Sequence, residues 1–323
     1  MKTQFFSLCF LALVLVTCAS CEPCAGNSDE DTVLCLRGLP KEDILQDQAI
    51  KQYLSKHRVY VSLSTSPTRI SKLLPVLQTV DTEYVENILL ALPQRYRNKE
   101  DGQYVIPPEI ANFPKLKIIR RDQDLGPIMK LIPAVEEVKA SDPEAIVITI
   151  DDDTGYPAGV FGQLIKAAIK QETVSAAIAR NLDISGLDRY QLMPSKTLLS
   201  KPECYSGHEI SYCDLVFGYA GVAYKAKWVN TDLLTTLSTL DPSCRTSDDL
   251  VISFGLALQN IPRVSVSNQY TPLPTQFAFG FRADALQRGS GSLQVASNSD
   301  VTSLRYRTCA KIMHEWVQKN ILF

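Results

Sequence analysis

Residues 145–153 read Ala-Ile-Val-Ile-Thr-Ile-Asp-Asp-Asp, an apolar run that stops abruptly at three carboxylates. A continuous run of this kind is typical of a central strand covered on both faces. In open α/β sheets, ligands bind beyond the carboxyl ends of the strands. The stretch therefore predicts a buried strand with a ligand site at its end.

The segments around this run alternate between short apolar strands and amphipathic helices. Strands are predicted at residues 59–63, 85–92 and 116–119, and apolar residues at helical spacing predict helices near 66–77, 127–138 and 157–169. Alternation of this kind implies βαβ units. The predicted fold class is therefore α/β, a Rossmann-like and mostly parallel sheet flanked by helices. Pro75 should kink the first of these helices or end it early.

The chain of 323 residues divides into four predicted parts. They are a signal peptide at 1–21, an N-terminal arm at 22–57, the α/β domain at 58–270, and a less regular C-terminal extension at 271–323 packed on it. The first part of the arm is polar and acidic, which predicts a flexible segment. Residues 93–114 are rich in Pro, Arg and polar residues and predict a long loop.

The N-terminus has the features of a secretory signal. Lys2 precedes an apolar run from Phe5 to Val16, and the small residues Ala19 and Ser20 mark a cleavage zone. The alternative is a short membrane anchor, although a helix needs about 20 apolar residues to span a bilayer. We expect a lumenal or secreted protein with no stable membrane span after cleavage.

Cysteine usage agrees with export. Cleavage after Cys21 leaves an even set, Cys24, Cys35, Cys204, Cys213, Cys244 and Cys309. In an oxidising compartment these predict up to three disulfides, and six cysteines allow about fifteen pairings. The Cys21–Cys24 spacing resembles a zinc or redox pair, but no second pair at ligand spacing accompanies it.

Composition excludes some classes of protein. Hydrophobic residues make up 45% and charged residues 21% of the chain, which suits a globular protein rather than a disordered one. The formal net charge is -2, so the charge balance gives no strong attraction to nucleic acid. No nucleic-acid partner is expected.

The three aspartates are the strongest candidate metal ligands. Adjacent carboxylates repel one another unless a cation neutralises them. If strand geometry persists, Asp151 and Asp153 point to the same side and can share one ion, and oxygen ligands suit Mg²⁺ or Mn²⁺. The alternative is a polar turn that caps the following helix.

A second acidic pair, Asp248-Asp249, precedes apolar residues at helical spacing. The pair should therefore lie at a helix N-terminus, where the helix dipole favours anions. Its functional interpretation is a general base that accepts a proton from an attacking hydroxyl. Its structural interpretation is helix capping by Ser247 or Asp248.

Basic and glycine residues supply further candidates. Arg69 and Lys130 fall in the first turns of predicted helices at the same sheet edge, where they could meet an anionic ligand such as a nucleotide diphosphate. In Phe-Gly-Tyr-Ala-Gly, residues 217–221, the two glycines allow close backbone approach to a ligand, or else make a tight turn. His314 is a candidate metal ligand from the C-terminal region, or a surface histidine.

Taken in order, these blocks resemble the GT-A fold of nucleotide-sugar glycosyltransferases, and more narrowly a largely uncharacterised subgroup. The blocks are Ser-Thr-Ser-Pro-Thr-Arg at 64–69, Asp-Leu-Gly-Pro-Ile-Met-Lys-Leu at 124–131, Asp151–Asp153 with Tyr156-Pro157, the 217–221 block, and Ser-Asp-Asp at 247–249. The resemblance covers about residues 58–268. An Asp-x-Asp motif alone has low specificity, and five blocks in order are far more specific.

The resemblance implies a role for each block. Asp151 and Asp153 would hold Mn²⁺ or Mg²⁺ against the diphosphate of a nucleotide-sugar donor, most often a UDP-sugar. Asp249, or Asp248, would be the base for in-line attack by a glycan or protein acceptor, which inverts the anomeric centre. The donor and nucleotide would contact Thr65, Arg69, Lys130, Asp151, Asp152, Gly218, Tyr219 and Gly221. His314 would complete the metal site.

Three other functions compete with this one. An inactive glycosyltransferase-like module would bind sugars or partners, but it predicts loss of carboxylates that are present here. A magnesium-dependent phosphohydrolase or nucleotidyltransferase leaves the 64–69 and 217–221 blocks unexplained. A secreted structural domain stapled by disulfides gives the triple aspartate no role. Hydrolysis of a nucleotide-sugar donor would separate the enzymes from the other two.

Overall fold

The computed structural model describes residues 24, 28–180, 205–206, 209–210, 213–266, 275–276 and 299–320. The predicted signal peptide and most of the predicted C-terminal extension lie outside these ranges. Among the helices within them, none combines the length and apolar character needed to cross a membrane.

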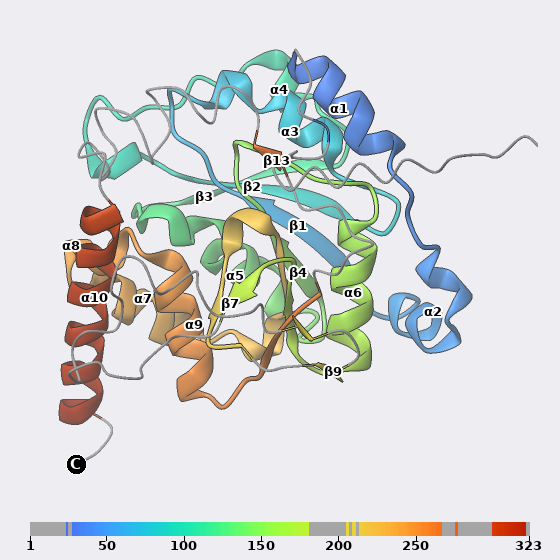
Figure 1. The fold of residues 1–323 in the computed structure, drawn as a ribbon. Coiled ribbons are helices and arrows are strands. Elements are labelled where there is room, and N and C mark those ends of the chain that lie inside the picture. Colours follow the sequence, from blue (N-terminus) through green and yellow to red (C-terminus); the bar gives the residue numbers. More distant parts are fainter. Residues whose placement is uncertain are drawn as a thin grey trace, which may run out of the picture.

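A seven-stranded sheet forms the centre of the protein (Figure 1). The strand order is β12-β6-β11-β4-β1-β2-β3, and only β11 runs antiparallel to its neighbours. The strands are β1 Val59–Leu63, β2 Asn87–Pro93, β3 Leu116–Arg121, β4 Ile146–Thr149, β6 Val174–Ala176, β11 Val222–Lys225 and β12 Arg263–Ser265. The predicted α/β class, with a mostly parallel sheet flanked by helices, is confirmed.

Alternate strand residues point to opposite sides of the sheet, and apolar residues on both sides are covered by helices. Val147 of β4 joins one apolar core cluster, whereas Ile146 and Ile148 join the other. The first cluster includes side chains of α5 Ile132–Lys139, α7 Thr231–Thr239, α8 Pro242–Arg245, α9 Asp248–Leu258 and α10 Ser299–Asn320. The second includes side chains of α1 Asp29–Gly38, α2 Gln48–Leu54, α3 Leu74–Thr79, α4 Pro108–Ala111 and α6 Val160–Lys170.

Short elements connect these layers. The 3-10 helices are η1 Ile44–Gln46, η2 Ile70–Lys72, η3 Tyr96–Asn98, η4 Gly126–Lys130, η5 Gly218–Ala220 and η6 Ala226–Trp228. Paired two-residue strands are β5 Thr154–Gly155 with β13 Thr275–Gln276, β7 Ala179–Arg180 with β10 Leu215–Val216, and β8 Tyr205–Ser206 with β9 Glu209–Ile210. The predicted long loop at 93–114 contains both η3 and α4.

Prolines set several helix starts that the sequence pattern placed too early. The helix predicted from residue 66 divides into η2 and α3 just before Pro75, which agrees with the interruption predicted there, and Pro75 lies in the first turn of α3. The helix predicted from residue 127 likewise divides into η4 and α5, with Pro133 in the first turn of α5. Proline is tolerated in a first turn because its missing N–H would have no helical partner there.

The prediction that the first, acidic part of the arm is flexible is wrong for residues 28–32, where helix α1 begins, and helix α2 lies farther along the arm. Ser28 caps α1 by accepting from the Asp31 N–H, and the acidic first turn suits the helix dipole. Leu36 of α1 is fully buried, and its carbonyl accepts from the Ala158 N–H at 3.1 Å. A Cys24–Cys35 disulfide ties the preceding chain to this helix.

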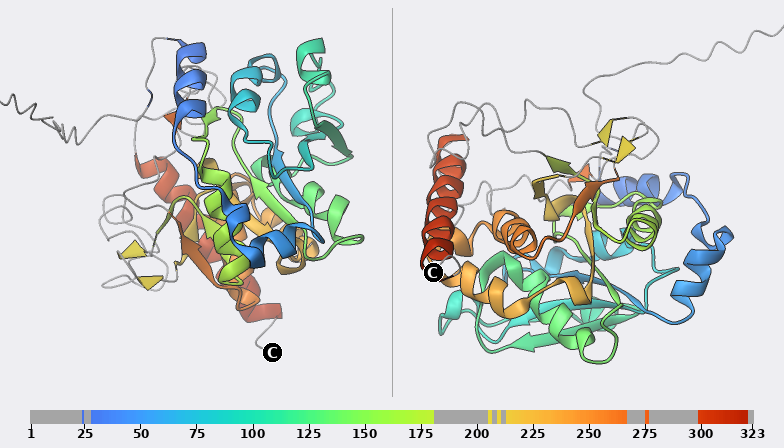
Figure 2. Two further views of the ribbon diagram at one scale, coloured as in Figure 1. Left: turned by 90° about the vertical axis from the view of Figure 1, so that its right-hand side faces the viewer. Right: turned by 90° about the horizontal axis from the view of Figure 1, so that it is seen from below.

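Within the predicted C-terminal extension, residues 299–320 form the 22-residue helix α10. The helix stands beside α8 at the opposite end of the molecule from α2 (Figures 1 and 2). A Cys244–Cys309 disulfide joins α8 to α10, and Cys213 is also disulfide-bonded. Such bonds are typical of proteins that fold in an oxidising compartment.

We predict that the N-terminal helix contributes directly to stability. Leu36→Ala should lower the free energy of unfolding by about 2–5 kcal/mol, because it deletes a fully buried side chain and leaves a cavity. Leu34→Ala, on the same helix but 63% exposed, should change it by less than about 0.5 kcal/mol. Urea unfolding of both variants measures the difference. Equal, small effects would mean that α1 is not part of the core.

Candidate functional site

Most of the predicted site residues gather at the carboxyl edge of the sheet. The aspartates 151–153 directly follow β4, and Thr65 and Arg69 lie between β1 and η2. Lys130 ends η4, and Asp248 and Asp249 open α9. The turn η5 adds Gly218 and Tyr219. Hydrogen bonds and ion pairs connect these segments into one cluster.

Arg69 holds the second and third aspartates. One of its terminal nitrogens lies 2.7 Å from Asp152 Oδ1 and 2.8 Å from Asp153 Oδ2. Thr65 Oγ1 donates to Asp152 Oδ2 at 2.6 Å. Burial acts to lower the pKa of Arg69, but the charges of Asp152 and Asp153 outweigh it and raise that pKa. Burial raises the pKa of Asp152 to about 7 against the opposing charge of Arg69.

Lys130 connects the two acidic motifs. Its ammonium donates to Asp151 Oδ1 at 2.6 Å and lies 3.0 Å from Asp248 Oδ2. The residue is only 4% exposed. Burial would lower the pKa of Lys130, yet the charges of Asp151 and Asp248 keep it well above its ordinary value. The lysine therefore carries its charge inside the protein and fixes the end of β4 to the start of α9.

Gly218 makes room for this lysine. A Cβ at position 218 would lie 2.6 Å from Lys130 Nζ and 3.0 Å from Asp249 Oδ1. The Gly218 N–H also donates to Asp249 Oδ1 at 2.8 Å. The close approach expected at these glycines thus accommodates Lys130 in this structure, rather than a ligand. Gly221 is needed for the turn, because its φ of +98° is a backbone conformation that residues other than glycine rarely adopt.

The Gly218 N–H fixes the orientation of Asp249, and the pKa of this carboxyl group is raised. Burial and the charge of Asp248 raise the pKa of Asp249 to about 7, while Lys130 and the Gly218 N–H act in the opposite direction. A carboxyl group with a pKa near neutrality can gain or release a proton at physiological pH, which is what general acid–base chemistry needs. The prediction of a helix N-terminus at this pair is confirmed, although Ser247 makes no side-chain cap.

Two tyrosines that the sequence did not single out as site residues support the cluster. Tyr156 is fully buried; its hydroxyl accepts from the Asp151 N–H at 2.9 Å and donates to the Tyr219 carbonyl at 2.8 Å. Tyr104 donates to the Thr65 carbonyl at 2.8 Å. Tyr156 could have been found from its position after the aspartates, whereas nothing in the local pattern marks Tyr104.

The donor set suits a divalent cation that takes further ligands from a bound anion. Five aspartates surround two basic side chains, so Arg69 and Lys130 supply part of the neutralisation that we assigned to a metal alone. The Asp151 side chain is 31% exposed and that of Asp153 14%, which leaves carboxylate surface open to the site. Mg²⁺ is usually held by one or two carboxylates together with substrate phosphates.

The third predicted ligand, His314, is not assembled with them. Within the part of the chain that the structure describes, no group of three or more His, Cys, Asp and Glu side chains is arranged to hold a metal ion. His314 Nε2 lies 3.0 Å from Gln318 Nε2 on the same helix.

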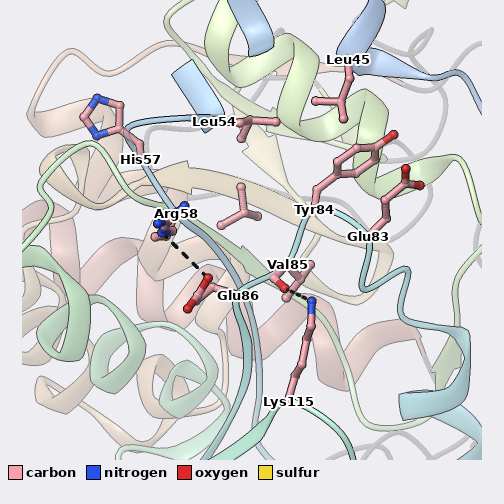
Figure 3. A pocket seen from close by; sticks show the side chains of 10 residues that line it. Leu45, Leu54, His57, Arg58, Glu83, Tyr84, Val85, Glu86 and Lys115 are labelled. Carbon is pink, nitrogen blue, oxygen red and sulfur yellow. Dashed lines mark hydrogen bonds and ion pairs between the residues drawn. The ribbon is translucent and has the colours of Figure 1, made fainter. Parts of the chain in front are cut away.

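A cavity of about 320 Å³ lies at the other edge of the sheet (Figure 3). Its lining comes from the chain just before β1, β2 and β3, which is the amino edge of these parallel strands. Arg58 there lies 3.8 Å from Glu86, and Lys115 donates to the Thr82 and Val85 carbonyls at 2.9 and 2.7 Å. Because ligands of open α/β sheets bind beyond the carboxyl ends of the strands, the aspartate cluster is the better candidate site.

Comparisons with known proteins identify no family. No family model matches the sequence, and no curated protein matches it. The structure is similar to GalNAc-T7 crystallised with UDP, GalNAc and Mn²⁺, at 11% identity and a TM-score of 0.40, over 74% of this chain. The chain spans about half, 46%, of that GalNAc-T7 chain.

Two further solved structures are similar over comparable lengths. One is UTP-bound UGPase from Acinetobacter baumannii, at 11% identity, a TM-score of 0.37, and coverage of 82% of this chain and 95% of that one. The other is the 2-C-methyl-D-erythritol 4-phosphate cytidylyltransferase of Francisella tularensis, at 11% identity, a TM-score of 0.34, and coverage of 67% and 92%. With TM-scores below 0.5, none of these similarities decides the function.

We predict that Asp249 makes stability depend on pH. With a pKa of about 7 in the folded protein and 3.8 as its ordinary value, the folded state binds more protons between these pH values. The free energy of unfolding should therefore fall as pH rises from about 4 to about 7.

Asp249→Asn should remove the contribution of Asp249 to this decrease in the free energy of unfolding. The variant should be more stable than the unsubstituted protein at pH 8, by an amount on the order of a few kcal/mol, and the difference should disappear near pH 4. Urea unfolding in a chelator measures it, with the exposed Asp232→Asn as the control. Equal stability of the Asp249 variant and the unsubstituted protein at pH 8 would contradict the burial of a charged carboxylate here.

Proposed function

We propose that this protein is a metal-dependent glycosyltransferase that moves a sugar from a nucleotide-sugar donor, a UDP-sugar in the first instance, to an acceptor hydroxyl. One observation carries the proposal: Lys130 joins an Asp-x-Asp motif at a strand end to a carboxylate pair at a helix N-terminus. Donor binding and proton abstraction need such groups side by side. The five sequence blocks that suggested this activity contribute the residues of this one cluster.

The donor would bind on the β4 side of the cluster. Asp151 and Asp153 would hold Mn²⁺ or Mg²⁺, which offsets the charge that builds on the leaving nucleotide diphosphate. Thr65 and Arg69 would border the nucleotide, with Asp152 holding the arginine in place through their ion pair. Gly218, Tyr219 and Gly221 would border the sugar.

The acceptor would be activated on the α9 side. Asp249, fixed by the Gly218 N–H, would take the proton from the attacking hydroxyl of a glycan or protein. Its raised pKa makes it a stronger base than an ordinary aspartate once it is ionised. Attack from the face opposite the leaving group would invert the anomeric centre.

Lys130 would couple the two halves. Because it donates to Asp151 and also lies against Asp248, a cation that binds to Asp151 competes with it for that carboxylate. The lysine would then interact more strongly with Asp248 or with the donor's phosphates. Its burial keeps water from weakening either interaction.

A non-catalytic sugar- or partner-binding module is the second candidate. One observation favours it: Arg69 and Lys130 already pair with all three aspartates of the strand-end motif, so the cluster holds together without a metal. Such a module would bind a sugar or a partner protein and would leave nucleotide-sugars intact.

We predict manganese-dependent donor binding by the mature chain. A panel of nucleotide-sugars, with and without Mn²⁺, should give a thermal shift and nucleotide release for at least one donor. Asp153→Asn should abolish the manganese-dependent release while the fold is retained, because this carboxylate would be a metal ligand. Asp142→Asn, at a carboxylate near the amino edge that pairs with His57, is the matched control.

The outcomes separate the two candidates. Release without dependence on Mn²⁺, or full release by Asp153→Asn, would refute the metal assignment. Binding of a sugar with no release from any donor would favour the non-catalytic module.

We also predict that a substitution of the general base impairs sugar transfer without impairing donor binding. Asp249→Asn should keep donor binding within about twofold but reduce transfer at least 100-fold, the lower end of what general-base catalysis contributes. Asp248→Asn should reduce transfer less, because its role would be to hold Lys130. Steady-state kinetics with saturating donor measures both. A larger loss in Asp248→Asn would reverse the assignment, and no loss in either would leave the pair as a helix terminus only.

A further inference from the structure

The loop between β2 and α4 folds back on itself. It contains η3, and the Tyr96 N–H donates to the Gly102 carbonyl at 2.7 Å across the loop. The rings of Tyr96 and Tyr104 meet edge to face, with centroids 6.5 Å apart. Residues 96–104 are therefore a folded unit rather than an open connection between the strand and the helix.

Asp124 anchors the first part of this loop. Arg97 and Asn98 have φ values of 54° and 56°, a left-handed conformation that persists in such residues only where surrounding contacts hold it. The Asp124 carboxylate accepts from the Arg97 N–H, and the Asp124 N–H donates to Asn98 Oδ1 at 2.8 Å. Arg245 Nη2 donates to the Asp124 carbonyl at 2.6 Å, which joins this anchor to the end of α8.

Tyr104 contacts the candidate site from the last part of the loop. Its hydroxyl donates to the carbonyl of Thr65, which is 8% exposed. Because β1 ends at Leu63, Thr65 lies beyond the residues that the sheet holds by strand pairing. The Arg120 guanidinium lies over the Tyr104 ring, 5.6 Å from its centroid, and donates to the Pro93 carbonyl at 3.1 Å. The ring is thus held on one side and restrains Thr65 on the other.

Thr65 passes this restraint to the strand-end motif. Its hydroxyl donates to Asp152 Oδ2 at 2.6 Å, and Asp152 Oδ1 lies 2.7 Å from an Arg69 nitrogen. A continuous chain of hydrogen bonds and ion pairs therefore runs from Tyr104 through Thr65 and Asp152 to Arg69. Loss of its first bond would free the start of the segment that carries Arg69.

We propose that Tyr104 is a positioning residue for the donor side of the site: by fixing Thr65, it orients the Asp152–Arg69 pair toward the donor nucleotide. The inference rests on the proposed function, because that function places Thr65 and Arg69 beside the nucleotide. Tyr104 acts through Thr65 and not by contact with the donor. Asp124 holds the loop in the conformation that presents Tyr104.

Tyr104→Phe removes the hydroxyl but keeps the ring and its contacts with Tyr96 and Arg120. We expect the donor KM to rise roughly tenfold, about the effect of one lost hydrogen bond at a buried group, and kcat to stay within about twofold. Tyr53→Phe is the matched control, because the Tyr53 hydroxyl also donates to a backbone carbonyl, that of Glu144. It should leave both constants unchanged. A donor KM equal to that of the unsubstituted protein in Tyr104→Phe would overturn the proposal.

A double-mutant cycle tests whether Tyr104 acts through Thr65. Thr65→Val removes the hydroxyl that donates to Asp152 and should also raise the donor KM. In the double variant, KM should be roughly that of Thr65→Val alone, because both changes break the same chain of contacts. A KM that rises by the full product of the two single effects would mean that Tyr104 acts independently of Thr65, contrary to the proposal.

Hydrogen exchange tests the positioning without requiring transfer. The Arg69 N–H donates to the Ser66 carbonyl at 3.0 Å, so exchange of this amide reports on the segment that follows Thr65. The exchange should accelerate at least about tenfold in Tyr104→Phe, as expected for a loosened local contact, and should not change in Tyr53→Phe.

The measurements distinguish failure of the proposal from failure of the proposed function. If the unsubstituted chain transfers no sugar but Arg69 exchange still depends on the Tyr104 hydroxyl, the glycosyltransferase function fails and the positioning by Tyr104 stands. If Arg69 exchange is the same in Tyr104→Phe and Tyr53→Phe, Tyr104 does not position this segment and the proposal is overturned.

Discussion

The ion pairs of one buried lysine organise the site. Lys130 is only 4% exposed, and its ammonium lies within 3.0 Å of carboxylates from two segments that are far apart in sequence. Removal of one partner from a buried ion pair leaves an uncompensated charge, which costs about 3–5 kcal/mol. The end of β4, the turn η5 and the start of α9 are therefore constrained together, and Gly218 is required because a Cβ would occupy the space of the ammonium group.

A second basic residue balances the other side of the motif. Arg69 pairs with Asp152 and Asp153, so the three consecutive aspartates divide between two cations from different loops. Strand alternation would group Asp151 with Asp153, and it does not apply here because β4 ends at Thr149 and Asp152 and Asp153 lie in a turn. The protein can thus fold around an acidic cluster before any ligand arrives.

Much of the fold could be predicted because it follows from local periodicity. The strands β1, β3 and β4 and the helices α6 and α9 have the apolar spacing that the sequence displays. The helix α1 was missed although Ser28 and the acidic residues after it are an available start signal. The split of predicted helices at Pro75 and Pro133 depends on proline preferring the first turn, which periodicity alone does not reveal.

The sequence could predict which residues belong to the candidate site, but not which of them contact each other. Asp151, Asp153, Asp249, Arg69 and Lys130 were found because their residue types recur at ends of strands and helices. That Lys130 joins Asp151 to Asp248 is a tertiary contact with no local signal. Tyr104 was missed for the same reason, because its hydrogen bond to the Thr65 carbonyl is also a tertiary contact.

The docking of α1 has a consequence for biosynthesis. Leu36 is synthesised before Ala158, whose N–H its carbonyl accepts in the folded protein. At the usual 5–20 residues per second, the intervening 122 residues (158 minus 36) take roughly 6–24 s to synthesise. During that interval α1 can pack on α3, but its hydrogen bond to residue 158 cannot form, so the docking of this helix is completed late in synthesis.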